Sequence, residues 1–173
     1  LCHLPVNAEL SFYVHKNTQF RLPAPEKDVI MIGPGTGIAP FRAFLSERDA
    51  TGAEGRNWLF FGDQHFITDF LYQTEIQNWV ETETLTHVSL AFSRDQQEKV
   101  YVQHKMLKQG AELFQWIDQG GYIYVCGAKD PMSVDVEKTL LLIIKQHGGK
   151  DSKGAEAYLD MLKEEGRYLK DVY

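Results

Sequence analysis

Residues 28–42 read Asp-Val-Ile-Met-Ile-Gly-Pro-Gly-Thr-Gly-Ile-Ala-Pro-Phe-Arg and contain the strongest structural signal in the chain. The four apolar residues from Val29 to Ile32 predict a buried strand, which leads through a glycine-rich turn into a helical pattern at residues 38–48. Pro40 is compatible with this helix because proline is tolerated in a first turn. A strand, a tight loop and a helix in this order are typical of a parallel α/β sheet.

The same alternation of apolar runs and helical patterns continues to the end of the chain. Further strands are predicted at residues 58–61, 87–92, 122–126 and 167–173. Three more helices are predicted. Asp69 caps the first, whose buried face carries Tyr72, Ile76, Trp79 and Val80. Asp130-Pro131 begins the second, which ends at Gly148-Gly149 and has a core stripe of Met132, Val136, Leu140, Ile143 and Ile144; the third covers residues 152–165. We therefore predict a doubly wound α/β fold with a five-stranded parallel sheet and helices on both faces.

The first 25 residues do not follow this pattern. Glu9 to Val14 alternates loosely and predicts a strand, and two prolines make residues 20–25 an extended linker. We expect residues 1–25 to be the end of a preceding element with its linker, and residues 26–173 to be the α/β domain. Because the chain starts with Leu1 and not Met, we expect it to be cut from something longer.

Composition excludes several classes of protein. The 173 residues are 43% hydrophobic and 12% aromatic, too apolar for a disordered chain. A formal net charge of -6 is opposite to what a nucleic-acid-binding surface requires. Two cysteines form no disulfide framework, no Cys or His spacing predicts a metal site, and no apolar run approaches the length of a membrane span. We expect a cytoplasmic protein with no membrane segment.

The turn Gly33-Pro-Gly-Thr-Gly37 is the first candidate binding element. Glycines let a backbone approach a phosphate closely, and a helix N-terminus offers free N–H groups; the alternative is a turn that only packs helix on strand. A P-loop would need Gly-Lys-Ser/Thr where this chain has Gly37-Ile38-Ala39, so phosphoryl transfer is disfavoured. A dinucleotide site fits better, although Pro40 replaces the usual third glycine. Asp63 lies near the position of a ribose-binding acid, which keeps an NAD dehydrogenase open.

A polar cluster at residues 93–103 follows the third predicted strand. Arg94 and Lys99 gather there beside hydroxyl and amide groups. A 2'-phosphate is best held by a guanidinium, a lysine and a hydroxyl, and a tyrosine ring can stack on adenine. The cluster favours NADP over NAD, while a solvated charged loop is the alternative.

Cys126 ends the fourth predicted strand, and the reacting part of a dinucleotide binds at such a strand end. A small, polarizable thiol can pack against a nicotinamide ring. A buried cysteine that acts only as a small hydrophobe is the alternative, and the residue pattern leaves both open.

Five motifs, at residues 33–42, 58–62, 91–103, 123–127 and 167–173, together resemble the NADPH-binding domain of the ferredoxin-NADP reductase family. They look most like the C-terminal part of diflavin reductases, above all the flavoprotein components of NADPH-dependent sulfite reductases. The resemblance covers essentially the whole chain. It implies a ferredoxin-reductase-like domain preceded by a short remnant of a flavin-binding β-barrel.

The resemblance also implies roles for individual residues. Cys126 and Asp171 match residues that assist hydride transfer beside the nicotinamide, and Tyr173 matches an aromatic residue that stacks on the flavin. The implied cofactor-binding residues are Gly35, Thr36, Gly37, Ser93, Arg94, Lys99, Val100, Tyr101, Val102, Gln103, Asp135 and Tyr173.

The implied activity is hydride transfer from NADPH to FAD for onward electron transfer. The implied partners are an upstream FAD-binding barrel, an FMN domain of the same protein, and an electron-acceptor protein such as a sulfite reductase hemoprotein. A short NAD dehydrogenase and a non-catalytic nucleotide-sensing module are the alternatives.

Two departures from the family pattern affect these expectations. Ala128 stands where the family usually has an acid, and Asp130 is the candidate substitute. The family's flavin-holding motifs, an Arg-x-Tyr-Ser stretch and a glycine-rich Ser/Thr turn, are missing from this chain. We therefore expect this chain alone to be inactive without the FAD-binding part.

Overall fold

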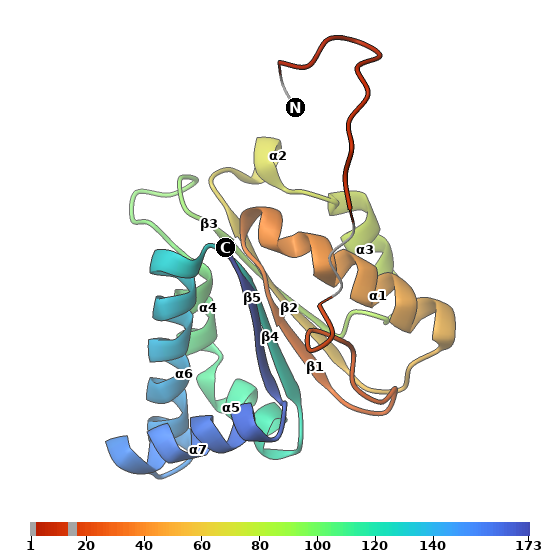
Figure 1. Ribbon diagram of the computed structural model, residues 1–173. Helices are drawn as coiled ribbons and strands as arrows, with labels where there is room; N and C mark the ends of the chain where they lie inside the picture. Colours follow the sequence, from red (N-terminus) through yellow and green to blue (C-terminus); the bar gives the residue numbers. More distant parts are fainter. Residues whose placement is uncertain (1–2, 14–16) are drawn as a thin grey trace.

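The computed structural model describes residues 3–13 and 17–173 and contains an all-parallel sheet (Figure 1). The five strands are β1 (Val29–Ile32), β2 (Asn57–Asp63), β3 (His87–Phe92), β4 (Tyr122–Gly127) and β5 (Tyr168–Val172). Their order in the sheet is β3-β2-β1-β4-β5, so the chain winds outward from β1 in both directions. The predicted doubly wound parallel fold is confirmed.

Helices cover both faces of this sheet (Figure 1). They are η1 (Gly35–Ile38), α1 (Ala39–Thr51), α2 (Phe66–Asp69), α3 (Gln73–Glu81), α4 (Val102–Lys108), α5 (Gly110–Asp118), η2 (Lys129–Ser133), α6 (Val134–His147) and α7 (Ser152–Glu164). Buried residues of α1 and α3 share one hydrophobic cluster, and those of α4 to α7 share the other. Each face of the sheet therefore has its own core.

Strand β1 separates these two cores. Ile30 and Ile32 belong to the cluster under α4 to α7, whereas Val29 and Met31 belong to the cluster under α1 and α3. Successive side chains of a strand point to opposite faces, so a strand that is covered on both faces needs an unbroken apolar run. This is why four consecutive apolar residues are found here.

The predicted strand at residues 9–14 is wrong for its described part. Residues 9–13 form no strand, and Phe12 is 82% exposed; Val14 lies outside the described residues. A strand needs a neighbour for its backbone hydrogen bonds, and the segment runs away from the sheet (Figure 1).

Three details of the helices also differ from expectation. Asp69 does not cap α3: it ends α2, and its carboxylate accepts a hydrogen bond from the backbone N–H of His65. Tyr72, in the left-handed conformation, precedes α3 instead, and both Tyr72 and Val80 are exposed. Asp130 does not cap α6, because the short π-helical turn η2 intervenes and α6 begins at Val134.

Helices α4 and α5 are absent from the prediction. Both carry an apolar face with helical spacing: Val102 and Met106 in α4, and Leu113, Trp116 and Ile117 in α5, are buried. This spacing was the signal that could have revealed them.

The linker before β1 packs against the α/β domain. Phe20 contacts the rings of Phe41, Phe44 and Tyr124, and only 8% of its surface is exposed. The hydroxyl of Tyr124 donates a 2.6 Å hydrogen bond to the carbonyl of Arg21. The linker residues next to β1 are therefore part of the folded core.

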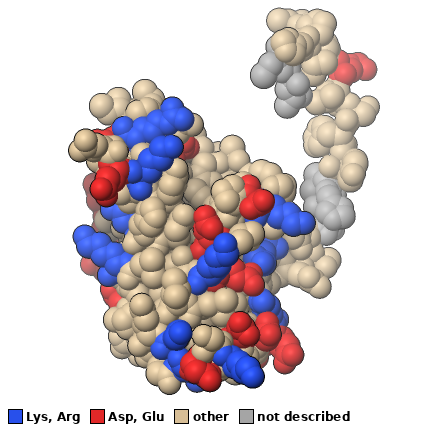
Figure 2. Space-filling model, turned by 90° about the vertical axis from the view of Figure 1, so that its left-hand side faces the viewer, with Lys and Arg blue, Asp and Glu red and all other residues tan. Residues whose placement is uncertain are grey.

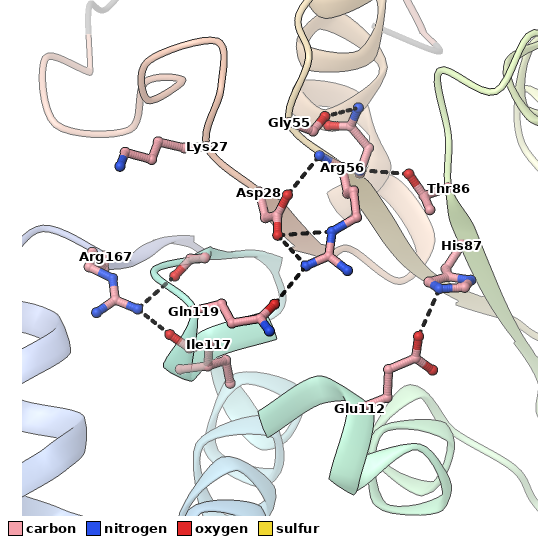
Figure 3. A network of polar contacts seen from close by, with 12 residues as sticks. Lys27, Asp28, Gly55, Arg56, Thr86, His87, Glu112, Ile117, Gln119 and Arg167 are labelled. Atoms are coloured by element: carbon pink, nitrogen blue, oxygen red, sulfur yellow. Dashed lines mark hydrogen bonds and ion pairs between the residues drawn. The ribbon is translucent and has the colours of Figure 1, made fainter. Parts of the chain in front are cut away.

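A polar network occupies the edge of the sheet where the strands begin (Figure 3). The Arg56 guanidinium donates to the carboxylate of Asp28 at 2.6 Å and lies over the ring of Trp116. Arg167 donates to the carbonyls of Ile117 and Gly121. These contacts tie together the segments that enter β1, β2, β4 and β5.

Charges of both signs are interspersed on the face of the molecule that Figure 2 shows. In helices α6 and α7, Glu137 accepts from Lys163 and, at 2.6 Å, from Lys170 of β5. Hydrogen bonds from these lysines outweigh burial and lower the pKa of Glu137.

We predict that Phe20→Ala lowers the free energy of unfolding by about 3 kcal/mol, because a buried ring is lost from a packed cluster. Phe12→Ala is the matched control, since its exposed ring makes the expected change less than about 0.5 kcal/mol. Urea denaturation of both variants measures the difference. Equal stability of the two would show that the linker does not contribute to the core.

Candidate functional site

Loops at the carboxyl ends of the strands surround a cavity of about 480 Å³, within the range of small-molecule sites. These loops follow β1, β2, β3 and β4. The cavity is lined by Pro34, Gly35, Gly62, Asp63, Gln64, Ala91, Ser93, Arg94, Lys99, Tyr101, Val102, Gln103, Ala128, Pro131, Met132 and Asp135. Eight of the residues predicted to bind a cofactor are therefore brought together: Gly35, Ser93, Arg94, Lys99, Tyr101, Val102, Gln103 and Asp135.

The glycine loop passes very close to the end of β4. A Cβ atom on Gly37 would lie 2.1 Å from the carbonyl oxygen of Cys126, which no side chain tolerates. Gly35 adopts φ +57, a left-handed conformation that favours glycine. These two glycines let the loop turn sharply, so that Gly35 borders the cavity while Gly37 packs against β4.

Backbone hydrogen bonds hold Ser93 and Arg94 beside the end of β2. The N–H of Ser93 donates to the carbonyl of Asp63 at 2.8 Å, and that of Arg94 donates to the carbonyl of Gln64 at 2.9 Å. Next along the chain, Asp95 accepts from the N–H of Phe66 at 2.8 Å. This bond and a second one to His65 lower the pKa of Asp95. The loops after β2 and β3 thus form one connected wall.

The cavity contains two cations, Arg94 and Lys99. Arg94 and Lys99 are exposed, and neither enters an ion pair within residues 3–13 and 17–173. Elsewhere, arginines such as Arg42 and Arg56 pair with Glu75 and Asp28. The cavity therefore offers a guanidinium and an ammonium group to an anionic ligand.

Lys99 and Tyr101 reach the cavity from the segment that leads into α4, and Gln103 reaches it from the first turn of α4. The N–H of Tyr101 donates to Nδ1 of His104, which helps fix the start of the helix. Val100 does not line the cavity; it packs against the core under α4 to α7. Asp135 reaches the cavity from the first turn of α6.

A second group of predicted residues lies outside the cavity lining. Cys126 of β4 pairs with Asp171 of β5, and Tyr173 follows β5 directly. The hydroxyl of Tyr173 shares a hydrogen bond with Thr36 of the glycine loop, and its N–H donates to the carbonyl of Gly127 at 3.1 Å. Thr36, Cys126, Asp171 and Tyr173 thus gather where β4 and β5 end, while Tyr173 stays 70% exposed.

Several cavity residues were not predicted as site residues. Gly62, Gln64 and Ala91 come from the ends of β2 and β3, and Ala128, Pro131 and Met132 follow β4. The rule that ligands bind outside the carboxyl ends of parallel strands was the available signal.

A family model described as "Oxidoreductase NAD-binding domain" matches residues 31–138, more than half of the chain. The chain belongs to this family. The match begins inside β1 and ends in α6, so it contains every described residue that lines the cavity.

Close relatives of this oxidoreductase domain are sulfite reductase [NADPH] flavoprotein alpha-components. The protein of Bacillus subtilis (strain 168) is 55% identical over 95% of this chain, and that of Salmonella typhi is 56% identical over 95%. That of Serratia proteamaculans (strain 568) is 55% identical over 98%. The matches cover 27%, 28% and 28% of these relatives, so the chain spans little more than a quarter of their length. The resemblance to reductases of this type is confirmed.

Within residues 3–13 and 17–173 of this oxidoreductase domain, no helix combines the length and apolar character needed to cross a bilayer.

Burial keeps the Cys126 thiol of this oxidoreductase domain protonated. The side chain is 4% exposed, and burial, with a smaller effect of the Asp171 carboxylate, raises its pKa to about 11. A thiol is neutral below its pKa, so Cys126 carries no charge at neutral pH.

We predict that Cys126 stays protonated at about pH 9.5, where an ordinary thiol with a pKa of about 8.5 is mostly ionised. Thiolate absorbance of a Cys2→Ser chain measures this, since Cys126 is then its one cysteine. In the same background, Asp171→Asn should lower the pKa of Cys126 only part of the way back to that of an ordinary thiol, because the thiol remains buried. A midpoint near 8.5 in the unsubstituted Asp171 chain would contradict the prediction.

Proposed function

We propose that this domain binds NADPH and presents it for hydride transfer to FAD in a larger reductase. The observation that carries the proposal is the convergence of Ser93, Arg94 and Lys99 on one cavity. A hydroxyl, a guanidinium and an ammonium group are suitable donors for a 2'-phosphate. The residues present therefore fit the phosphorylated adenosine half of NADPH.

Other residues of the cavity suit the adenine ring and the pyrophosphate of NADPH. Tyr101, whose ring is exposed beside the cations, offers a stacking surface for adenine. Gly35 and the start of η1 leave the backbone open to a pyrophosphate. Val100, which is partly buried and packs against the core under α4 to α7, would support Lys99 and Tyr101 and would not itself contact the ligand.

We assign the nicotinamide end to Thr36, Cys126, Asp171 and Tyr173. When bound, NADPH supplies a hydride from C4 of its nicotinamide, which N5 of FAD accepts. The neutral Cys126 thiol gives the ring a small, polarizable surface and adds no charge beside the hydride. Asp171 lies opposite Cys126 in the adjacent strand and offers a carboxylate at the strand end.

Tyr173 covers this end of the site. Its hydrogen bond to Thr36 and its backbone contacts to Gly127 and Lys129 hold it between the loops after β1 and β4. We infer that its ring must move before a nicotinamide can approach Cys126. In the complete protein the same ring would stack on the flavin.

The relatives suggest which domains and which electron acceptor this domain works with. Their name describes the NADPH-linked flavoprotein component of a sulfite reductase, and this chain matches about a quarter of it. We propose that residues 1–25 join residues 26–173 to a preceding FAD-binding barrel, and that an FMN domain of the same protein carries electrons onward. A sulfite reductase hemoprotein in the cytoplasm is the proposed acceptor.

Arg94→Ala should weaken binding of adenosine 2',5'-bisphosphate about ten- to a hundredfold, because a charge-assisted hydrogen bond to the 2'-phosphate is lost. Adenosine 5'-monophosphate, which lacks that phosphate, should bind the variant and the unchanged chain alike. Isothermal titration calorimetry measures both ligands.

Arg21→Ala is the matched control for Arg94→Ala, because this exposed arginine lies in the linker, away from the cavity. It should leave both affinities unchanged. If the unchanged chain bound the two ligands equally, the proposed function would be wrong.

Tyr173→Gly should strengthen binding of NADP⁺, because the ring no longer covers the nicotinamide end. Binding of adenosine 2',5'-bisphosphate should not change, since that ligand has no nicotinamide. Fluorescence titration of the variant with each ligand tests the difference. An unchanged NADP⁺ affinity would argue against a covering role for Tyr173.

A further inference from the structure

Asp63 is a carboxylate in a cavity proposed to bind phosphate. It is the last residue of β2, and it borders the same space as Arg94 and Lys99. The proposed function, on which this inference rests, gives Asp63 no role. A carboxylate near a dianionic ligand is unfavourable, so its presence requires a reason.

The strand register brings Asp63 next to Ser93. Asp63 pairs with Phe92 across β2 and β3, and its carbonyl accepts the Ser93 N–H at 2.8 Å. Its side-chain Oδ1 accepts the N–H of Gln64 at 2.7 Å. Within the described ranges 3–13 and 17–173, no protein donor contacts the other carboxylate oxygen, Oδ2. This oxygen can therefore accept a hydrogen bond from a ligand.

The charges that line the cavity are balanced. Arg94 and Lys99 supply two positive charges, and Asp63 and Asp135 supply two negative ones. Asp135 belongs to α6 and lies 4.0 Å from Lys138, so part of its charge is offset outside the cavity. Asp63 has no such partner among the described residues, so its charge is not offset by an ion pair there.

We propose that Asp63 sets the preference of this site between phosphorylated and unphosphorylated adenosine. Its charge opposes a 2'-phosphate held by Ser93 and Arg94. Where the 2'-phosphate is absent, its carboxylate accepts a hydrogen bond from a ribose hydroxyl. Asp63 thus makes the preference for NADPH over NADH smaller than the two cations alone would make it.

Asp63→Asn removes the negative charge and leaves the shape of the side chain nearly unchanged. The amide is nearly isosteric and keeps an oxygen that can accept the Gln64 N–H, so the turn after β2 is preserved. Asp63→Ser is a second neutral variant in case the amide adopts another contact. Glu54→Gln removes the same charge from an exposed position between α1 and β2, at the opposite edge of the sheet, and is the matched control.

The experiment compares the dissociation constants of adenosine 2',5'-bisphosphate and adenosine 5'-monophosphate for the unchanged chain and the three variants. Asp63→Asn and Asp63→Ser should tighten the bisphosphate about three- to tenfold and should weaken the monophosphate. The ratio of the two constants should therefore shift at least about threefold toward the bisphosphate. Glu54→Gln should not change it. The shift should shrink at high salt, because its origin is electrostatic.

A ratio that is unchanged in both neutral Asp63 variants overturns the inference, and so does an equal change for both ligands. The proposed function fails by a different result, namely an unchanged chain that does not prefer the bisphosphate. In that case the ratio in the Asp63 variants still decides whether Asp63 discriminates.

Discussion

Burial of β1 on both faces and hydrogen bonding along both its edges is the constraint on which the structure depends. β1 pairs with β2 on one side and β4 on the other, and its four residues are fully buried. A polar side chain in β1 would be buried away from water, and helices on both faces share hydrophobic clusters with its side chains. Because β1 is paired along its whole length, the glycine loop follows its last residue and lies at the carboxyl end of the strand.

The position of the site follows from this arrangement. Because β2 and β4 lie on opposite sides of β1, the connections after β1 and β4 run in opposite directions and a crevice opens between them. Gly37 can pack against the carbonyl of Cys126 only because it lacks a side chain. This close approach brings the glycine loop and the end of β4 together, and with them the two halves of the proposed dinucleotide site.

Cations at the two ends of the strands differ in whether they have partners within the fold. At the edge where the strands begin, Arg56 is paired with Asp28, and Arg167 donates to backbone carbonyls. At the opposite edge, Arg94 and Lys99 have no carboxylate partner in the part of the chain that the structure describes. A cation that is satisfied within the fold stabilises it, whereas an unpaired one remains available to a ligand. This contrast supports the proposal that the ligand binds at the carboxyl ends of the strands.

Local pattern alone predicted the five strands of the sheet and the glycine loop and singled out the polar segment around Arg94, because each depends on residues close together in sequence. Helices α4 and α5 carried a readable apolar spacing that the prediction missed. Only the tertiary structure decided that Asp69 ends a helix and does not begin one, since Tyr72 takes the left-handed turn before α3. Likewise, only folding brings Tyr173 to Thr36, 137 residues away, and Asp63 to Ser93. Such contacts depend on strand order and register, which no short stretch of sequence specifies.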